Sequence, residues 1–190
     1  MTMASVESPA PARLTLAVGA RDHLRGPVAA PLTLVEYGDF ECPQCRQAAP
    51  ILREIERGFG DRLRFVFRHF PLTNSHPNAQ RAAEAAEWAG AQGSFWPMHD
   101  AIYDDGDRLS EARLLDLAAT LGGAPASLEE AWRAHTFFPR VKEDFRSGLA
   151  SGVTGTPAFF VDGVRHEAAW DLDSLVRALE AVAARAQRSG

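Results

Sequence analysis

The two cysteines of the chain, Cys42 and Cys45, are separated by only two residues and constrain its fold and chemistry more than any other feature. An apolar run, Leu32–Val35, precedes them and predicts a buried strand, because interior strands of parallel sheets are almost continuously apolar. A helix-patterned segment from about Pro43 to Arg57 follows them. The pair is therefore expected where a strand ends and a helix begins.

The start of a helix favours a reactive thiolate at the first cysteine of such a pair. Partial positive charge and unpaired N–H groups gather there, and both stabilise the thiolate, which is the nucleophilic form. Pro43 suits this first turn because its missing N–H is not needed there. Cys45 follows by about one helical turn, within reach of a disulfide. We predict that Cys42 is the exposed, low-pKa attacking sulfur and that Cys45 is the more buried resolving thiol.

Three other interpretations of the cysteine pair stay open at this point. It could be half of a zinc site, although zinc takes four ligands, no second pair of cysteines exists, and His69 and His76 complete no recognised spacing. It could be a structural disulfide, although so short a loop removes little entropy from the unfolded chain. Both thiols could also be inert and buried. A redox-active pair that needs no metal and no organic cofactor fits the sequence best.

Length, composition and charge narrow the class of protein. A chain of 190 residues with 46% hydrophobic residues suits one folded core with an insertion. The net charge of −5 argues against a general binder of nucleic acid or of anionic membranes. Apolar runs of the length of a membrane span are absent from the sequence.

The N-terminal residues bear on the compartment. Residues 1–12 are rich in Ala, Ser and Pro and are predicted to form a flexible tail. They carry no basic segment, and the apolar run Leu14–Val18 is too short for the core of a secretion signal. We therefore expect a cytoplasmic protein, where cysteines at this spacing are usually catalytic or metal-binding. If a leader has been removed, a periplasmic or other extracytoplasmic location is expected instead.

Strand patterning occurs on both sides of a long helical block. Leu14–Val18 is a candidate first strand, and residues 62–70 predict a strand after the first helix, which gives a βαβ unit. Residues 157–167 predict a hairpin whose two-residue turn is Asp162–Gly163. Asp171 is expected to cap a last helix that extends to about residue 187.

The block between these units has helical periodicity and no strand signal. Ser110 is expected to cap one of its helices, and Ser127 to Glu130 form a capping box at the start of another. The predicted organisation is a tail of residues 1–12, a first domain of residues 13–73 and 152–188, and an inserted all-helical domain of residues 74–151.

Three segments resemble the DsbA-like thiol:disulfide oxidoreductases: Val35–Cys45, Phe67–Leu72 and Gly152–Phe160. The resemblance covers about residues 21–185. It implies an α/β thioredoxin fold, in the order βαβ…ββα, with an inserted helical domain. It also implies an enzyme, a protein disulfide oxidoreductase that exchanges disulfides with protein or small-thiol substrates through a Cys-Pro-Gln-Cys site.

The same resemblance implies roles for individual residues. Cys42 matches the family's nucleophile and Cys45 its resolving thiol. Thr156 and Pro157 match the cis-proline loop that lies beside the cysteines, where a turn can offer short β-like pairing to a substrate chain. Glu36 matches a buried acid whose pKa is raised by burial and which could exchange protons with the resolving thiol.

The dipeptide between the cysteines departs from the family pattern. Strongly oxidising members usually have His before the second cysteine, whereas this chain has Pro43 and Gln44. Gln44 cannot supply positive charge to a Cys42 thiolate, although its amide can donate a hydrogen bond. The redox potential, and with it the direction of electron flow, therefore stays open between about −120 and −270 mV.

The expected partners are thiol-containing protein or peptide clients and a redox partner of unknown identity, and the expected state is a monomer. Two other functions stay open. One is a glutathione-dependent transferase or isomerase on a related fold, although such enzymes usually carry a single Ser or Cys in place of the pair. The other is a redox-sensing or chaperone-like binding module whose disulfide switches its affinity for a partner.

Overall fold

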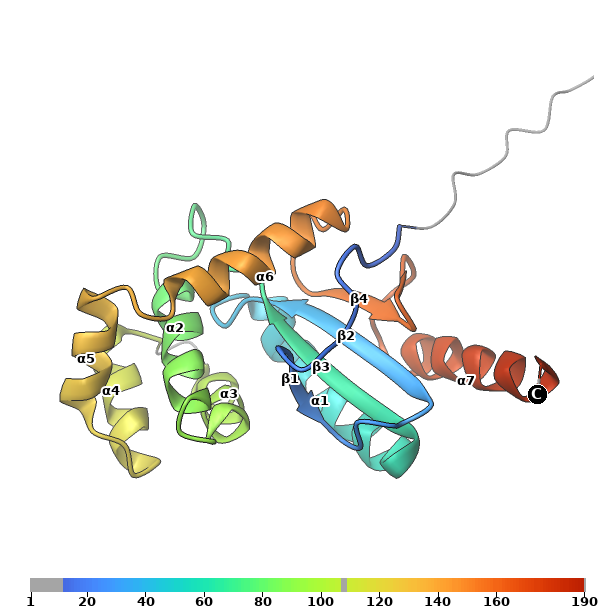
Figure 1. The fold of residues 1–190 in the computed structure, drawn as a ribbon, viewed down its shortest axis with the longest axis horizontal. Helices are drawn as coiled ribbons and strands as arrows, with labels where there is room; N and C mark the ends of the chain where they lie inside the picture. The colour runs from blue at the N-terminus through green and yellow to red at the C-terminus, as the bar shows by residue number, and fades with distance from the viewer. Residues whose placement is uncertain (1–11, 107–108, 190) are drawn as a thin grey trace, which may run out of the picture.

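The computed structural model describes residues 12–106 and 109–189, and most of the predicted N-terminal tail lies outside them. One five-stranded sheet in the order β1-β3-β2-β4-β5 forms its centre (Figure 1). The strands are β1 His23–Arg25, β2 Leu32–Gly38, β3 Leu63–His69, β4 Ala158–Val161 and β5 Val164–Arg165. β2 and β3 are parallel and the other pairs are antiparallel, so β1 and β5 are the edges.

Seven helices and one 3₁₀ turn accompany the sheet in the described residues. They are α1 Pro43–Phe59, η1 Gly60–Arg62, α2 Ala79–Gly90, α3 Phe95–Asp104, α4 Glu111–Thr120, α5 Pro125–Arg133, α6 Phe138–Ala150 and α7 Leu172–Ser189. In Figure 1, α2 to α5 form a group beside the sheet, and α6 leads from that group back across the sheet toward β4. The element order is therefore the predicted βαβ, helical block and ββα, with an additional edge strand before it. Among the described residues, no helix combines the length and the apolar character needed to cross a membrane.

Every residue of β2 is buried because both faces of the sheet are covered. Leu34 packs in the cluster that includes α1, α3 and α7, whereas Val35 and Tyr37 pack on the opposite face with Phe160 of β4. Side chains alternate between the two faces of a strand, so Glu36 is expected on the Leu34 face, the one that α1 covers. A carboxylate at a buried position of a central strand is costly unless it is paired with a positive charge or takes up a proton.

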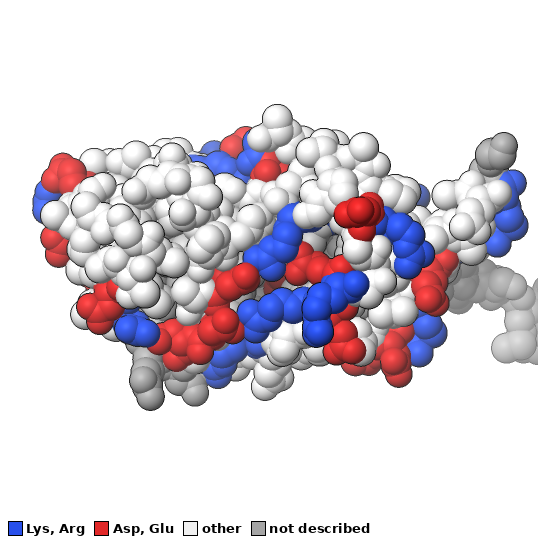
Figure 2. Space-filling model, turned by 90° about the horizontal axis from the view of Figure 1, so that it is seen from below, with Lys and Arg blue, Asp and Glu red and all other residues white. Residues whose placement is uncertain are grey.

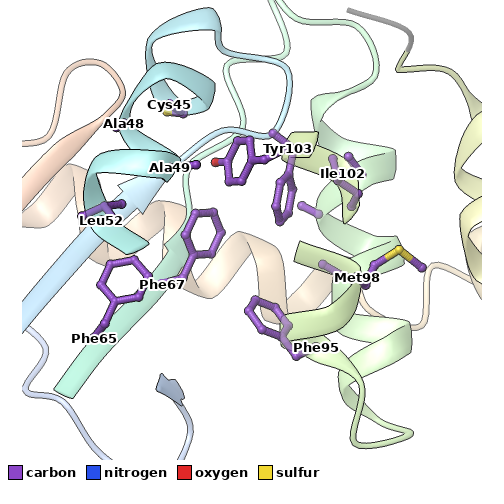
Figure 3. Close-up of a cluster of buried hydrophobic side chains, with 14 of the residues drawn as sticks. Cys45, Ala48, Ala49, Leu52, Phe65, Phe67, Phe95, Met98, Ile102 and Tyr103 are labelled. Carbon is purple, nitrogen blue, oxygen red and sulfur yellow. The ribbon is translucent and has the colours of Figure 1, made fainter. Parts of the chain in front are cut away.

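The first helix covers this face with an apolar stripe at helical spacing. Its buried residues are Cys45, Ala48, Ala49, Leu52, Ile55 and Phe59. Figure 3 shows Cys45, Ala49 and Leu52 facing the same cluster as Phe67 of β3 and Tyr103 of α3. The helix continues without interruption through Pro50, and the Pro50 side chain is exposed to solvent. The second cysteine is thus part of the core at the point where the sheet meets the helical block.

Leu14–Val18 is not a strand, and that prediction is wrong. The first strand is β1, where His23 pairs with Phe67 of β3. Leu14 and Val18 instead pack against the second face of the sheet. The carbonyl groups of Leu16 and Ala17 accept hydrogen bonds from the buried Arg68 guanidinium, which competes with strand pairing.

Helix caps were predicted with mixed success. Ser110 Oγ accepts a hydrogen bond from Arg113 N, and Asp171 Oδ1 accepts one from Ser174 N, as expected. The capping box at Ser127 is wrong, because α5 already begins at Pro125. Proline favours the first helical position, and the Ser127 hydroxyl instead accepts a hydrogen bond from Trp88 Nε1.

Candidate active site

The cysteine pair lies at the junction of β2 and α1. Cys42 has extended backbone angles at the N-cap of α1, and Pro43 occupies the first turn. The Cys42 N–H donates to Asp39 O at 3.1 Å, and Arg46 N donates to Cys42 O at 3.1 Å. The strand therefore ends in a tight turn that delivers the first cysteine to the positive end of the helix.

Cys42 is only 2% exposed, so the prediction of an exposed attacking sulfur is wrong. In its protonated form its thiol donates hydrogen bonds to Gln44 Oε1 at 3.1 Å and to Thr156 O at 3.4 Å. The loop before β4 therefore lies directly against the sulfur, which the spacing of the cysteines alone does not reveal. Pro43 and Gln44, which follow Cys42, are exposed, so the surface nearest to the sulfur is formed by these two residues and this loop.

The two thiols have opposite pKa shifts. A hydrogen bond from the Cys45 thiol lowers the pKa of Cys42 to about 5. Burial of Cys42 acts in the opposite direction, whereas Thr156 and backbone N–H groups also lower the pKa. Burial raises the pKa of Cys45 well above its usual range, although Asp39 N donates to its Sγ at 3.5 Å. The thiols are not bonded to each other. At neutral pH, one sulfur is a thiolate and the other is the proton donor that stabilises it.

Glu36 is 1% exposed and lies on the central strand below the cysteines. Burial, with smaller contributions from Cys42 and Glu56, raises the pKa of its carboxyl to about 8. Its Oε1 is buried without a hydrogen-bond partner among the described residues. A Cβ on Gly38 would lie 3.1 Å from that oxygen, so the glycine leaves space for the carboxyl. A buried acid that titrates near neutral pH is suited to carry a proton.

The peptide bond between Thr156 and Pro157 is cis, and β4 begins at the next residue. Antiparallel pairing of Ala158 with Tyr37 holds this loop beside the end of β2. The Thr156 hydroxyl is buried and is one of the groups that lower the pKa of Cys42. Pairing across the sheet thus brings together segments that are far apart in the sequence.

Two acidic side chains near the cysteines were missed by the sequence interpretation. Asp39 is 1% exposed and its carboxylate accepts hydrogen bonds from Glu41 N, Leu72 N and His76 Nδ1, each at 2.8 Å. Glu41 accepts hydrogen bonds from Asn78 N and Asn78 Nδ2. The only sequence signal was the presence of two acidic residues, separated by Phe40, just ahead of Cys42.

Three buried side chains form a candidate metal cluster. His69, Glu87 and Asp144 each offer a ligand atom, and these atoms lie within 4.8 Å of one another. However, Asp144 already forms ion pairs with Arg21 at 2.7 Å and with Arg140 at 2.6 Å. Two guanidinium groups already neutralise the Asp144 carboxylate, so the cluster fits a buried ion-pair network better than a metal site.

Charged side chains are mixed on the surface of the protein. On the face shown in Figure 2, acidic and basic groups lie next to one another rather than in separate patches. Ion pairs of this kind include Arg25 with Glu56 and with Asp100, and Arg53 with Asp104. This face therefore offers no broad basic surface for nucleic acid.

Comparison with known proteins places the chain in a family. A family model described as thioredoxin matches residues 20–181, and the chain belongs to that family. BdbD from Bacillus subtilis has a similar fold with a TM-score of 0.79 and 23% identity, covering 91% of this chain and 97% of that one. Wolbachia pipientis α-DsbA1 aligns with a TM-score of 0.77 and 19% identity, covering 93% of this chain and 97% of the other. The α/β thioredoxin fold and the resemblance to DsbA-like proteins are confirmed.

Sequence relatives with higher identity are much longer proteins. A protein named Na(+)/H(+) antiporter NhaA 1 from Salinispora arenicola is 46% identical over 159 residues, which is 84% of this chain and 24% of the relative. A protein of the same name from Mycolicibacterium vanbaalenii is 44% identical over 163 residues, 85% of this chain and 26% of the relative. The chain thus spans about a quarter of the length of these relatives.

Proposed function

We propose that the protein is a thiol:disulfide oxidoreductase that uses Cys42 and Cys45. The observation that carries the proposal is the opposite shift of two thiol pKa values at the start of one helix. A thiolate beside a protonated, buried partner is the arrangement that disulfide exchange requires. Membership of the thioredoxin family and the DsbA-like fold support it.

In the oxidising direction, the cysteines begin as a disulfide. A thiolate of the client attacks Cys42 Sγ, which forms a mixed disulfide and releases Cys45 as a thiolate that takes up a proton. A second client thiolate then attacks the client sulfur of the mixed disulfide and releases Cys42 as a thiolate. The client loses two electrons and the cysteine pair gains them. In the reducing direction the steps reverse, and Cys45 resolves the mixed disulfide.

The Glu36 carboxyl and the backbone of Thr156 also have proposed roles in these steps. Glu36 exchanges a proton with Cys45, because its carboxyl titrates near neutral pH and its charge contributes to the pKa of that thiol. The backbone of Thr156, ahead of Pro157, pairs with an extended client chain, because its carbonyl lies against the attacking sulfur. Pro43 starts the helix, and Gln44 contacts the Cys42 thiol. We propose that disulfide exchange by this pair requires no metal and no organic cofactor.

An equilibrium redox titration in glutathione buffers tests the proposal, with a thiol count on the same sample. Reversible oxidation of one cysteine pair is expected. A potential well above about −200 mV would mean that the protein donates disulfides, and one near −270 mV that it is a reductant. A pair that never cycles, or that binds stoichiometric zinc, would refute the oxidoreductase function.

A second candidate function follows from the longer relatives. Their printed name is that of a Na(+)/H(+) antiporter, and they contain a segment that is 40–46% identical to this chain. This favours a redox-responsive unit that acts on, or together with, an antiporter. Cation transport measured in vesicles containing the longer protein, with the pair reduced and then oxidised, would differ under this hypothesis. A Cys42→Ser variant would abolish that difference.

Several finer predictions remain proposals of the sequence and fold. We infer that residues 74–151 form the inserted helical domain, and that residues 13–73 and 152–188 form the thioredoxin-like domain. We also keep the predictions of a monomer, of thiol-containing clients and of a cytoplasmic location. Size measurement in solution and fractionation of cells that produce the natural full-length protein test the state and the location.

A further inference from the structure

Two hydrogen-bonded acidic side chains tie the turn before Cys42 to the segment between β3 and α2. Asp39 accepts from Leu72 N and from His76 Nδ1, and Glu41 accepts from the backbone and side chain of Asn78. His76 is the ion-pair partner of Asp39 among the described residues, and the two atoms lie 2.8 Å apart. Its side chain is 18% exposed, whereas that of Asp39 is fully buried.

The backbone of Asp39 also forms hydrogen bonds with both cysteines. Its carbonyl accepts a hydrogen bond from Cys42 N at 3.1 Å, and its N–H donates to Cys45 Sγ at 3.5 Å. The backbone of Asp39 is thus held beside both cysteines, and its buried carboxylate belongs to the same turn as the Cys42 thiolate. Two like charges in a low-dielectric region repel each other strongly unless a positive charge lies near them.

We propose that His76 is a positioning residue that, in its protonated form, neutralises Asp39 and thereby stabilises the Cys42 thiolate. This inference rests on the proposed oxidoreductase function and deepens it. The start of α1 and hydrogen bonds to the sulfur already favour the thiolate, but Gln44, which lies between the cysteines, carries no charge. The segment between β3 and α2 adds a full positive charge at His76.

The groups that face His76 agree with this assignment. They are Asp39, Cys42 and Glu41, all of which carry or can carry negative charge. Burial disfavours the charged imidazole, but the contact with Asp39 and the charges of Cys42 and Glu41 outweigh it and raise the pKa of His76. Electrostatic coupling is reciprocal, so the attraction by which Cys42 raises the pKa of His76 also favours the thiolate form of Cys42.

The test substitutes His76→Gln and measures the pKa of Cys42 from thiolate absorbance of the reduced protein. The pKa of Cys42 is expected to rise by about one unit, so that the thiolate fraction falls about tenfold at a pH well below that pKa. Because the reduced form loses its stabilisation, the reduction potential should fall by about 30 mV, the value of a tenfold change in equilibrium constant. An unchanged Cys42 pKa in the folded variant overturns the proposal.

Two further variants separate charge from structure. His76→Lys keeps positive charge, so the low Cys42 pKa should be retained, and it serves as the test if His76→Gln does not fold. If His76→Lys raises the Cys42 pKa as much as His76→Gln does, His76 has only a structural role. His135→Asn, at an exposed position with φ of 53°, is the matched control and should change nothing.

The pKa readout does not depend on turnover. If the unaltered protein fails to exchange disulfides, the proposed function falls, whereas the comparison of the variants still decides the role of His76.

Discussion

The Sγ atom of Cys42 lies 3.4 Å from the carbonyl oxygen of Thr156, although 114 positions separate the two residues. The sheet produces this contact, because Tyr37 at the end of β2 pairs with Ala158 at the start of β4. The attacking sulfur and the proposed client-binding backbone are therefore fixed by the same strand pair. A client bound along this loop would present its own sulfur close to Cys42.

The first prediction concerns the pH dependence of alkylation. Cys42 should react with iodoacetamide with a half-maximal rate near pH 5, because only its thiolate is nucleophilic and its pKa is about 5. Cys45 should stay unmodified through neutral pH because burial raises its pKa. Mass spectrometry of peptides from the alkylated, folded protein measures both sites. Equal labelling of both cysteines would contradict the assignment.

Serine substitutions should separate the roles of the two thiols. Cys45→Ser removes the resolving thiol, so a mixed disulfide between Cys42 and a client or glutathione should accumulate. Cys42→Ser removes the nucleophile, so neither exchange nor the adduct should be observed. Non-reducing electrophoresis and intact mass detect the adduct. If Cys42→Ser forms the adduct and Cys45→Ser does not, the roles are reversed.

Replacing Glu36 with Gln should affect stability and catalysis in opposite directions. The folded pKa of about 8 is above the usual value of 4.5, so the stabilising contribution of this carboxyl is complete below about pH 4.5 and is lost as the pH rises to 8. Glutamine does not ionise, so Glu36→Gln does not lose this stability. At pH 8 its free energy of unfolding should exceed that of the unaltered protein by on the order of 3 kcal/mol.

The same variant should release and take up the Cys45 proton more slowly, which lowers the rate of resolution by about a hundredfold. Urea denaturation at two pH values and stopped-flow exchange measure the two effects. The surface variant Glu129→Gln is the control for removal of one carboxylate. A stability gain that is the same at pH 4 and pH 8 would show that the charge of Glu36 is not its cause.

The sequence was most informative where chemistry and local pattern coincide. The strand before Cys42 and the helix after it follow from apolar periodicity and from the spacing of the pair, whereas the burial of Glu36 was expected only from the family resemblance. The hairpin turn Asp162–Gly163 could also be predicted, because both residues adopt the positive φ angles that such a turn requires. Local pattern determines these features almost alone.

Long-range contacts explain what the sequence did not reveal. Cys42 was expected to be exposed, but the loop that covers it approaches through strand pairing far along the chain. His76 was considered only as a zinc ligand, because nothing local shows that its ring reaches Asp39. Leu14–Val18 has the composition of a strand, and only the buried Arg68 explains why its carbonyls bond elsewhere.

Glycine substitutions test the close packing beside Glu36. A Cβ at Gly38 would lie 2.3 Å from Phe67 Cε2, so Gly38→Ala must displace the ring and should cost about 1–3 kcal/mol. Gly58→Ala is the control, because this glycine of α1 has open space around it and alanine favours a helix by about 1 kcal/mol. Chemical denaturation should therefore show opposite signs. Equal stabilities would mean that Phe67 moves away freely.

The buried ion pair of Arg68 and Asp22 should be essential for stability. Arg68 donates to both Asp22 oxygens, at 2.9 and 3.1 Å, and to Tyr37 Oη at 3.0 Å, with both charged side chains fully buried. Arg68→Met removes the guanidinium but leaves the carboxylate in the core. We expect a loss of about 3–5 kcal/mol in the free energy of unfolding at pH 7.

The pH dependence of stability identifies the unpaired Asp22 carboxylate as the cause of that loss. Burial raises the pKa of Asp22, but bonding to Arg68 outweighs burial and lowers it, so the pair stabilises the fold above the usual pKa of 3.8 and less as the pH falls below it. In Arg68→Met the carboxyl can be protonated, so its deficit should shrink between about pH 7 and pH 4. Arg68→Met combined with Asp22→Leu should recover most of the loss, since no charge remains buried. A double variant as unstable as Arg68→Met would instead assign the loss to the carbonyl groups of Leu16 and Ala17, which lose their donors in both variants.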